Sequence, residues 1–288
     1  YGEIGNEPDF NADRGGGEGD SGSCFGGQAA AYGAYLRAGY VAAKGADASA
    51  TVLFGGVAYD RFYNKSGYSP TGPFDYTFVK SVLDWLYANH HGESGWPFFD
   101  WMAVHVYNDY RNAWDGTQPY DQELLGKIKH LRTNQMLHVG QYDLRSKPLA
   151  VTEADLISMP TDSWTTRSED YQAHYASQLL IRSMVAGLRT VTWYSVEDHH
   201  TGACTDIYAW IGAGLLRSMD VYEAAQACGS QNPIPDYVVT EDHEPKPGHT
   251  SYGVGVRQLA GATYQAQLTS GQTGSAQIEA YRFTRPDS

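Results

Sequence analysis

The sequence predicts an α/β fold built on a parallel sheet, and three observations support this. Five apolar, β-branched segments alternate along the chain with segments whose apolar residues recur at helical spacing. No hairpin turn stands between consecutive strands, so each connection is a crossover, as parallel strands require. Each strand is almost continuously apolar, which indicates burial on both faces. A chain of 288 residues is long enough for one large domain, or for a domain with an appendage.

The first two strand-then-helix units occupy the N-terminal part of the chain. Residues 1–7 have the character of a strand interior, the polar and Gly-rich segment 9–27 predicts a loop, and the Ala- and Tyr-rich segment 28–44 predicts a helix. The run ATVLFGGVA at 50–58 predicts the second strand. Apolar residues spaced by three and four positions predict a helix over 74–87.

Three further strands follow in the same alternation. The run FDWMAVHVYN at 99–108 predicts the third strand, and a loop separates it from a helical segment at 121–138. The run PLAVTEADL at 148–156 predicts the fourth strand, before a helix over 169–188. The run TVTWYSVED at 190–198 predicts the fifth strand. The two repeated periods, two for strands and 3.6 for helices, therefore predict one continuous α/β layer structure.

The C-terminal part departs from this alternation. Residues 199–248 have no clear periodicity and predict irregular structure, followed by a short helix near 250–260. Within 262–285, the runs ATYQAQL and AQIEAYRF alternate with period two around the Gly-rich SGQTGS, which predicts a β-hairpin. We therefore expect a boundary that separates 1–261 from a β-rich element at 262–288.

The charge balance argues against two classes of partner. Twenty basic residues against thirty-three acidic ones give a formal net charge of −13, which repels a phosphate backbone and an anionic bilayer. No apolar run approaches the roughly 18 residues that span a membrane. We expect neither a nucleic-acid nor a membrane partner. The 22 Tyr and 7 Trp residues are typical of proteins that handle sugars, and also of an aromatic-rich core.

Metal-binding patterns are incomplete in this sequence. Four polar residues occupy positions 1, 3, 5 and 12 of an EF-hand-like frame, but position 6 is Arg14 where glycine is required. These four residues are Asp9, Asn11, Asp13 and Asp20. The run DHH at 198–200 lacks a third ligand at a fitting spacing. The cysteines Cys24, Cys204 and Cys228 contain no CxxC pair, which disfavours zinc and leaves room for one disulfide. We expect no metal and no cofactor.

Two glutamates stand where chemistry is expected in such a fold. Glu7 ends the first predicted strand and Glu153 ends the fourth, and the carboxyl ends of parallel strands face the ligand side. Glycoside hydrolysis needs a carboxyl group to protonate the leaving oxygen and a carboxylate to attack or to activate water. A strand-end glutamate is, however, often only a solvated or capping group.

The residues around this pair resemble a known group of enzymes. Asn6-Glu7-Pro8 and Thr152-Glu153 match the motifs that retaining glycoside hydrolases of clan A carry at the ends of strands four and seven of a (β/α)8 TIM barrel. The context YGEIGNEPD is most similar to the β-xylosidase/α-L-iduronidase family and to the α-L-arabinofuranosidases. The resemblance runs from Tyr1 to about Tyr264, with the intermediate strands in the expected order.

This resemblance implies roles for five residues. Glu7 would be the general acid/base and Glu153 the nucleophile of a double displacement. Asn6 would hydrogen-bond the sugar 2-hydroxyl, and Tyr107 would donate to Glu153 and keep it ionised. Trp193 would be the platform beneath the sugar ring, although packing in the barrel wall is the alternative.

Other positions are weaker candidates. His105 shares a strand face with Tyr107 and is either a substrate-binding residue or a satisfied core histidine. Trp114 and Trp164 lie on predicted loops at the catalytic face, where they would stack on sugar rings or cover neighbouring loops. Glu3 shares a face with Glu7 and is expected to be a polar member of the barrel interior.

The match begins at strand four, so the sequence predicts a partial barrel of strands four to eight with the start of a C-terminal β-sandwich. We expect the chain to be an internal fragment of a longer enzyme, with open barrel edges that favour self-association. A non-catalytic carbohydrate-binding protein and a metal-dependent hydrolase are the competing classes. A carbohydrate substrate and an extracellular or periplasmic location are expected, whereas the sugar, its linkage and exo or endo action are not specified.

Overall fold

The computed structural model forms two compact units. The first comprises residues 1–156 and 188–194, and the second comprises 157–187 and 195–288. The described residues are 1–10, 25, 28–58, 74–75, 77–107, 124–158, 168–199, 212–229 and 238–286. The predicted hairpin at the C-terminus belongs to the second unit.

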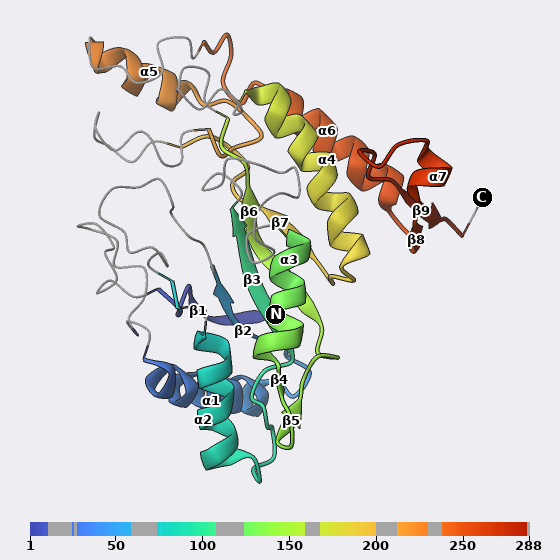
Figure 1. The fold of residues 1–288 in the computed structure, drawn as a ribbon. Coiled ribbons are helices and arrows are strands. Elements are labelled where there is room, and N and C mark those ends of the chain that lie inside the picture. The colour runs from blue at the N-terminus through green and yellow to red at the C-terminus, as the bar shows by residue number, and fades with distance from the viewer. Residues whose placement is uncertain are drawn as a thin grey trace. The chain divides into compact units, whose positions relative to one another are not determined.

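A five-stranded parallel sheet forms the centre of the first unit (Figure 1). Its strands are β1 (Gly2–Asn6), β2 (Val52–Val57), β3 (Trp101–Tyr107), β6 (Leu149–Asp155) and β7 (Val191–Trp193). The strands lie in the order β1-β2-β3-β6-β7, which is also their order in the sequence, and every neighbouring pair is parallel. The predicted α/β class with crossover connections is therefore confirmed. In the described part of the chain, β1 and β7 form the two ends of this sheet.

The middle of the sheet is buried on both faces, as the apolar runs predict. All residues of β2 are buried, and in β3 only Trp101 keeps partial exposure. Burial of each large apolar side chain contributes about 1.5–3 kcal/mol relative to exposure. The end strand β1 is only half-buried, because a single neighbour covers it.

Two helices pack beside each other in this unit, α1 (Ala29–Ala46) and α2 (Phe78–His90) (Figure 1). In α2 the buried residues recur at helical spacing, as the sequence predicts, and include Phe78, Val82 and Leu86. The helices approach closely because Gly33 has no side chain: a Cβ there would lie 2.7 Å from the ring of Trp85.

The segment predicted to be helical over 121–138 has a more complex structure in its described part. Helix α3 (Leu124–His130) continues as a π-helical turn η3 (Leu131–Gln135), and a short antiparallel pair follows, β4 (Leu137–His138) and β5 (Tyr142–Asp143). Tertiary hydrogen bonds explain the difference: Asp84 of α2 accepts from His138 Nδ1 at 2.8 Å and from Tyr142 Oη at 2.6 Å. These contacts outweigh the local helical preference.

The second unit contains two long helices that run side by side, α4 (Glu169–Val185) and α6 (Pro247–Leu259) (Figure 1). Ser168 caps α4 by accepting a hydrogen bond from Tyr171 N at 3.1 Å. The prediction of irregular structure over 199–248 is wrong in part, because helix α5 (Met219–Ala227) lies within it. This helix buries only Val221 and Ala225, one turn apart, so its periodicity is weak in the sequence.

The C-terminal hairpin is confirmed as an antiparallel pair of β8 (Thr263–Gln267) and β9 (Tyr281–Thr284). Its connection is not the simple turn that SGQTGS predicts. A short helix α7 (Ser270–Thr273) occupies that segment, and a capping box between Thr269 and Gln272 begins it.

A buried ion pair holds the loops of the second unit together. Lys246 Nζ lies 2.6 Å from Asp198 Oδ1, and both side chains are almost fully buried. Ser158 Oγ and the carbonyl oxygens of Gly212 and Gly214 also lie within hydrogen-bond distance of the ammonium group, which shares its three protons among these acceptors. This set of partners offsets the desolvation cost of the buried charge.

Among the described helices, none combines the length and the apolar character that crossing a bilayer requires. Cys228 is disulfide-bonded, and the other two cysteines lie outside the described residues.

Candidate active site

The two predicted catalytic glutamates lie at the carboxyl ends of the parallel strands. Glu7 directly follows β1, and its amide donates to the carbonyl oxygen of Gly56 in β2 at 3.0 Å. Glu153 lies in β6, in register with His105 of β3. Glu7 has a positive φ of 42°, a conformation that glutamate rarely adopts. The chain therefore turns sharply at this residue, directly before Pro8.

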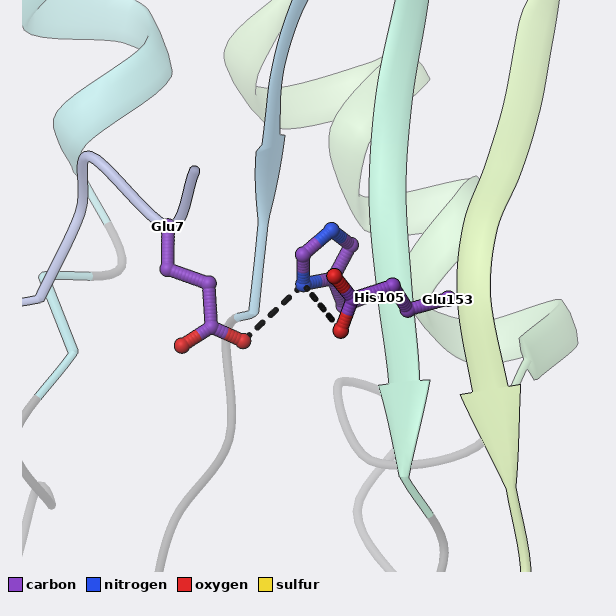
Figure 2. Close-up of side chains that lie close together, drawn as sticks. All are labelled: Glu7, His105 and Glu153. Atoms are coloured by element: carbon purple, nitrogen blue, oxygen red, sulfur yellow. Dashed lines mark hydrogen bonds and ion pairs between the residues drawn. The ribbon is translucent and has the colours of Figure 1, made fainter. Parts of the chain in front are cut away.

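His105 lies between the two glutamates (Figure 2). Its Nδ1 atom is 2.9 Å from Glu7 Oε1 and 3.5 Å from Glu153 Oε2. One carboxylate oxygen of each glutamate and one ring nitrogen of His105 all lie within 4.8 Å of one another. The sequence could place the two glutamates at the same edge of the sheet, but only the folded chain shows an imidazole between them.

The environment of His105 favours its protonated form. Burial of the ring, which has no exposed surface, by itself lowers the pKa of His105. The carboxylates of Glu3 and Glu7, together with the charge of Glu153, outweigh this effect and raise the pKa to about 10. The site thus places a buried histidine ring, in a setting that favours its protonated form, between two partly exposed glutamates.

Tyr107 donates a hydrogen bond to Glu153 Oε2, so the bond that the resemblance implies is confirmed. Burial of the phenol, and then the negative charges of Asp155 and Glu153, raise the pKa of Tyr107 far above its usual range. Tyr107 therefore stays a hydrogen-bond donor at all working pH values. The ring of Tyr194, which the sequence analysis did not single out, meets that of Tyr107 edge-on at 6.4 Å between centroids.

A buried lysine that the sequence analysis also missed supports the backbone below the site. Lys127 of α3 donates from Nζ to the carbonyl oxygens of Ala58 at 2.6 Å and of His105 at 3.0 Å. It thereby ties the ends of β2 and β3 to one helix. The available signal in the sequence was its position three residues after Leu124 and four before Leu131, on the apolar face of the helix.

The remaining predicted site residues have different surroundings. Asn6 is exposed at the end of β1, and Trp193 in β7 is buried and pairs with Ala154 of β6. Trp114 and Trp164 lie outside the described residues. The substrate-binding roles of all four residues stay predictions.

Acidic groups suggested as metal ligands have other partners where the structure describes them. Asp9 is buried and accepts from Ala58 N at 3.1 Å, and Asp198 pairs with Lys246. A group that the sequence analysis did not suggest lies in the second unit and brings three ligand atoms within 4.8 Å of one another. Its members are the partly exposed Glu197 and the exposed Asp242 and His243. In the glutamate pair, the His105 nitrogen that faces the carboxylates has Glu7 Oε1 as a hydrogen-bond partner at 2.9 Å.

The two glutamates bring carboxylate oxygens close together. Retaining glycosidases hold their two carboxyl groups about 5–5.5 Å apart, whereas inverting enzymes need about 6.5–9.5 Å to admit a water molecule. Glu7 and Glu153 present oxygens within 4.8 Å of each other.

Comparison with known proteins supports the fold class. No family model matches the chain, and no curated protein matches it. A solved structure described as a glucosidase from Croceicoccus marinus is similar, with a TM-score of 0.52 at 16% sequence identity. The alignment covers 92% of this chain and 41% of that one. The chain therefore has a mixed α/β, glycosidase-like fold and spans about two fifths of the length of that neighbour.

Proposed function

We propose that this chain carries the catalytic pair of a retaining glycoside hydrolase of clan A. The observation that carries the proposal is the pair Glu7 and Glu153, whose oxygens lie within 4.8 Å at the carboxyl ends of a parallel sheet. The likeness of the fold to a glucosidase supports the same class. Both glutamates are present, which favours an enzyme over a non-catalytic carbohydrate-binding protein.

The reaction proceeds as a double displacement. Glu153 attacks the anomeric carbon and forms a glycosyl ester, while Glu7 gives its proton to the glycosidic oxygen as that bond breaks. Glu7 then removes a proton from water, whose oxygen attacks the anomeric carbon and releases Glu153 as a carboxylate. The hydrogen bond from Tyr107 to Glu153 supports this division of roles, because the phenol donates to a carboxylate oxygen of the nucleophile and holds that group in place.

Substrate recognition involves residues around the pair. Asn6 at the end of β1 would bind the sugar 2-hydroxyl, and Trp193 would contact the ring. Trp114 and Trp164 would add stacking contacts. The disulfide at Cys228 supports an extracellular or periplasmic location, since disulfides persist in oxidising compartments.

The test uses two variants of the protein and a panel of aryl glycosides. Glu153→Ala should abolish turnover, and azide should restore it with inversion at the anomeric carbon. Glu7→Ala should lower the rate by about 10²–10⁴ for poor leaving groups and spare the glycosylation step for good ones. Glu223→Ala, at an exposed position of α5, is the control and should keep full activity.

The outcome is decisive in either direction. Azide rescue of the Glu7 variant in place of the Glu153 variant would reverse the two roles. Binding of oligosaccharides without turnover by the unmodified protein would favour the carbohydrate-binding class instead.

A further inference from the structure

Glu3 lies in β1, four residues before Glu7, and faces Nε2 of His105, whereas Glu7 and Glu153 face Nδ1. Its Oε1 atom accepts a hydrogen bond from Gly56 N at 2.6 Å and lies 3.8 Å from His105 Nε2. The second distance is too long for a hydrogen bond but is within ion-pair range. Nε2 is buried and has no hydrogen-bond partner in the described part of the chain. Among the described residues, Glu3 therefore supplies a compensating charge on that side of the ring.

The contact depends on a glycine between the two side chains. A Cβ at Gly56 would lie 2.1 Å from His105 Nε2 and 2.9 Å from Glu3 Oε1. Only a residue without a side chain lets Glu3 and His105 approach across β2. The Gly56 amide also holds the Glu3 carboxylate in place, so the carboxylate is fixed relative to the ring.

The described groups around His105 come from three strands and one helix. Carboxylates approach from β1, from the residue after β1 and from β6, while a phenol on its own strand and an ammonium group at its carbonyl oxygen complete the set. These groups are Glu3, Glu7, Glu153, Tyr107 and Lys127. The imidazole therefore has carboxylates at both nitrogens, and two of the three belong to the proposed catalytic pair.

We propose that Glu3 is a positioning residue whose carboxylate keeps His105 protonated and centred between Glu7 and Glu153. The catalytic effect of Glu3 rests on the proposed function, whereas its effect on the charge state of His105 does not. Two glutamates close together repel each other whenever both are ionised, and the imidazolium offsets that repulsion. An imidazolium buried without exposed surface needs compensation at both nitrogens, and Glu3 supplies it at Nε2.

The first test follows the charge state of His105 in the unmodified full-length protein by NMR, with histidine-selective isotope labelling. His105→Gln identifies the signal. We expect His105 to keep its proton through neutral pH, in line with a pKa of about 10. Titration near the ordinary value of about 6.5 would overturn the inference without reference to any further variant.

The second test is Glu3→Gln, which keeps an oxygen for the Gly56 amide and removes only the charge. Loss of an opposite charge at this distance should lower the pKa of His105 by about 1 to 3 pH units. Glu223→Gln in α5 makes the same charge change at an exposed position and should leave the titration unchanged. An identical His105 titration in Glu3→Gln and the unmodified protein would contradict the inference.

Kinetics then connect the charge to the reaction. The ratio of kcat/KM for Glu3→Gln to that of the unmodified protein should fall by about tenfold between pH 6 and pH 9, because only the variant loses the imidazolium charge in that range. A purely structural role would lower the ratio equally at all pH values. If the unmodified protein cleaves no glycoside but His105 titrates as expected, the proposed function fails and the role of Glu3 stands.

Discussion

Replacement of Gly56 by alanine tests the geometry of the site with a single methyl group. The added Cβ would lie 2.1 Å from His105 Nε2 and 2.4 Å from its Cδ2, whereas ordinary contacts begin near 3.4 Å. The ring would have to retreat by roughly 1 Å, the difference between these contacts and van der Waals separation. His105 has no free space in which to do so, because it is fully buried.

Two effects of Gly56→Ala follow from this displacement. Overpacking in a buried site costs about 1–3 kcal/mol, which corresponds to a decrease in Tm of roughly 2–4 °C for each kcal/mol. Moving the ring also breaks the 2.9 Å contact of Nδ1 with Glu7. A misplacement of about 1 Å in a catalytic group can cost about a hundredfold in rate.

The assay combines thermal unfolding with kcat/KM on an aryl glycoside. Gly45→Ala is the matched control, since a Cβ there meets nothing within 4 Å and the residue lies in helix α1. Alanine in a helix stabilises by roughly 0.5–1 kcal/mol relative to glycine, so this control should unfold at the same or a higher temperature. A Gly56→Ala protein as stable and as active as Gly45→Ala would refute the packing described for Glu3, Gly56 and His105.

Four further outcomes are expected. Tyr107→Phe removes only the donor to Glu153. Loss of a hydrogen bond to a charged group, worth about 1.5–3 kcal/mol, should lower kcat/KM by roughly 10- to 100-fold. The control Tyr35→Phe, on the exposed side of α1, should leave kcat/KM unchanged. The raised pKa of His105 stabilises the folded protein fully below about pH 6.5, and this stabilisation is lost as the pH rises toward 10. The free energy of unfolding measured with urea should therefore fall over that interval in the unmodified protein and should not fall in His105→Gln. Lys127→Met leaves two buried carbonyl oxygens without this donor and should lower the free energy of unfolding by about 1–3 kcal/mol for each. An unchanged midpoint of chemical denaturation would contradict the hydrogen bonds from Lys127 to Ala58 and His105. The described sheet has β1 and β7 at its ends and the protein should self-associate through them, so a well-behaved monomer by light scattering would argue against open sheet edges.

The order of the parallel strands could be predicted from the sequence because it depends on local patterns. Apolar runs such as 50–58 specify buried strands, and the helical spacing in 74–87 specifies crossovers between them. Once consecutive parallel strands are recognised, the placement of Glu7 and Glu153 at one edge of the sheet follows from chain direction alone.

Short elements were beyond this reasoning because their own sequences specify them weakly. The two-residue strands β4 and β5 depend on hydrogen bonds from His138 and Tyr142 to Asp84, more than 50 positions earlier in the chain. Helix α5 presents only two buried side chains, Val221 and Ala225, and so shows little periodicity.

The sequence by itself determined the α/β class and the position of Glu7 and Glu153 at one edge of the sheet, while the hydrogen bond from Tyr107 to Glu153 was implied by the resemblance to a known family. Tertiary structure alone decided what His105 does. Its pKa and its burial depend on carboxylates from β1 and β6 and on the absence of a side chain at Gly56, which are brought to the ring from positions roughly 50 to 100 residues away. Charge and packing act through distance in space, so no local pattern around His105 could reveal that it is a buried imidazolium between two glutamates.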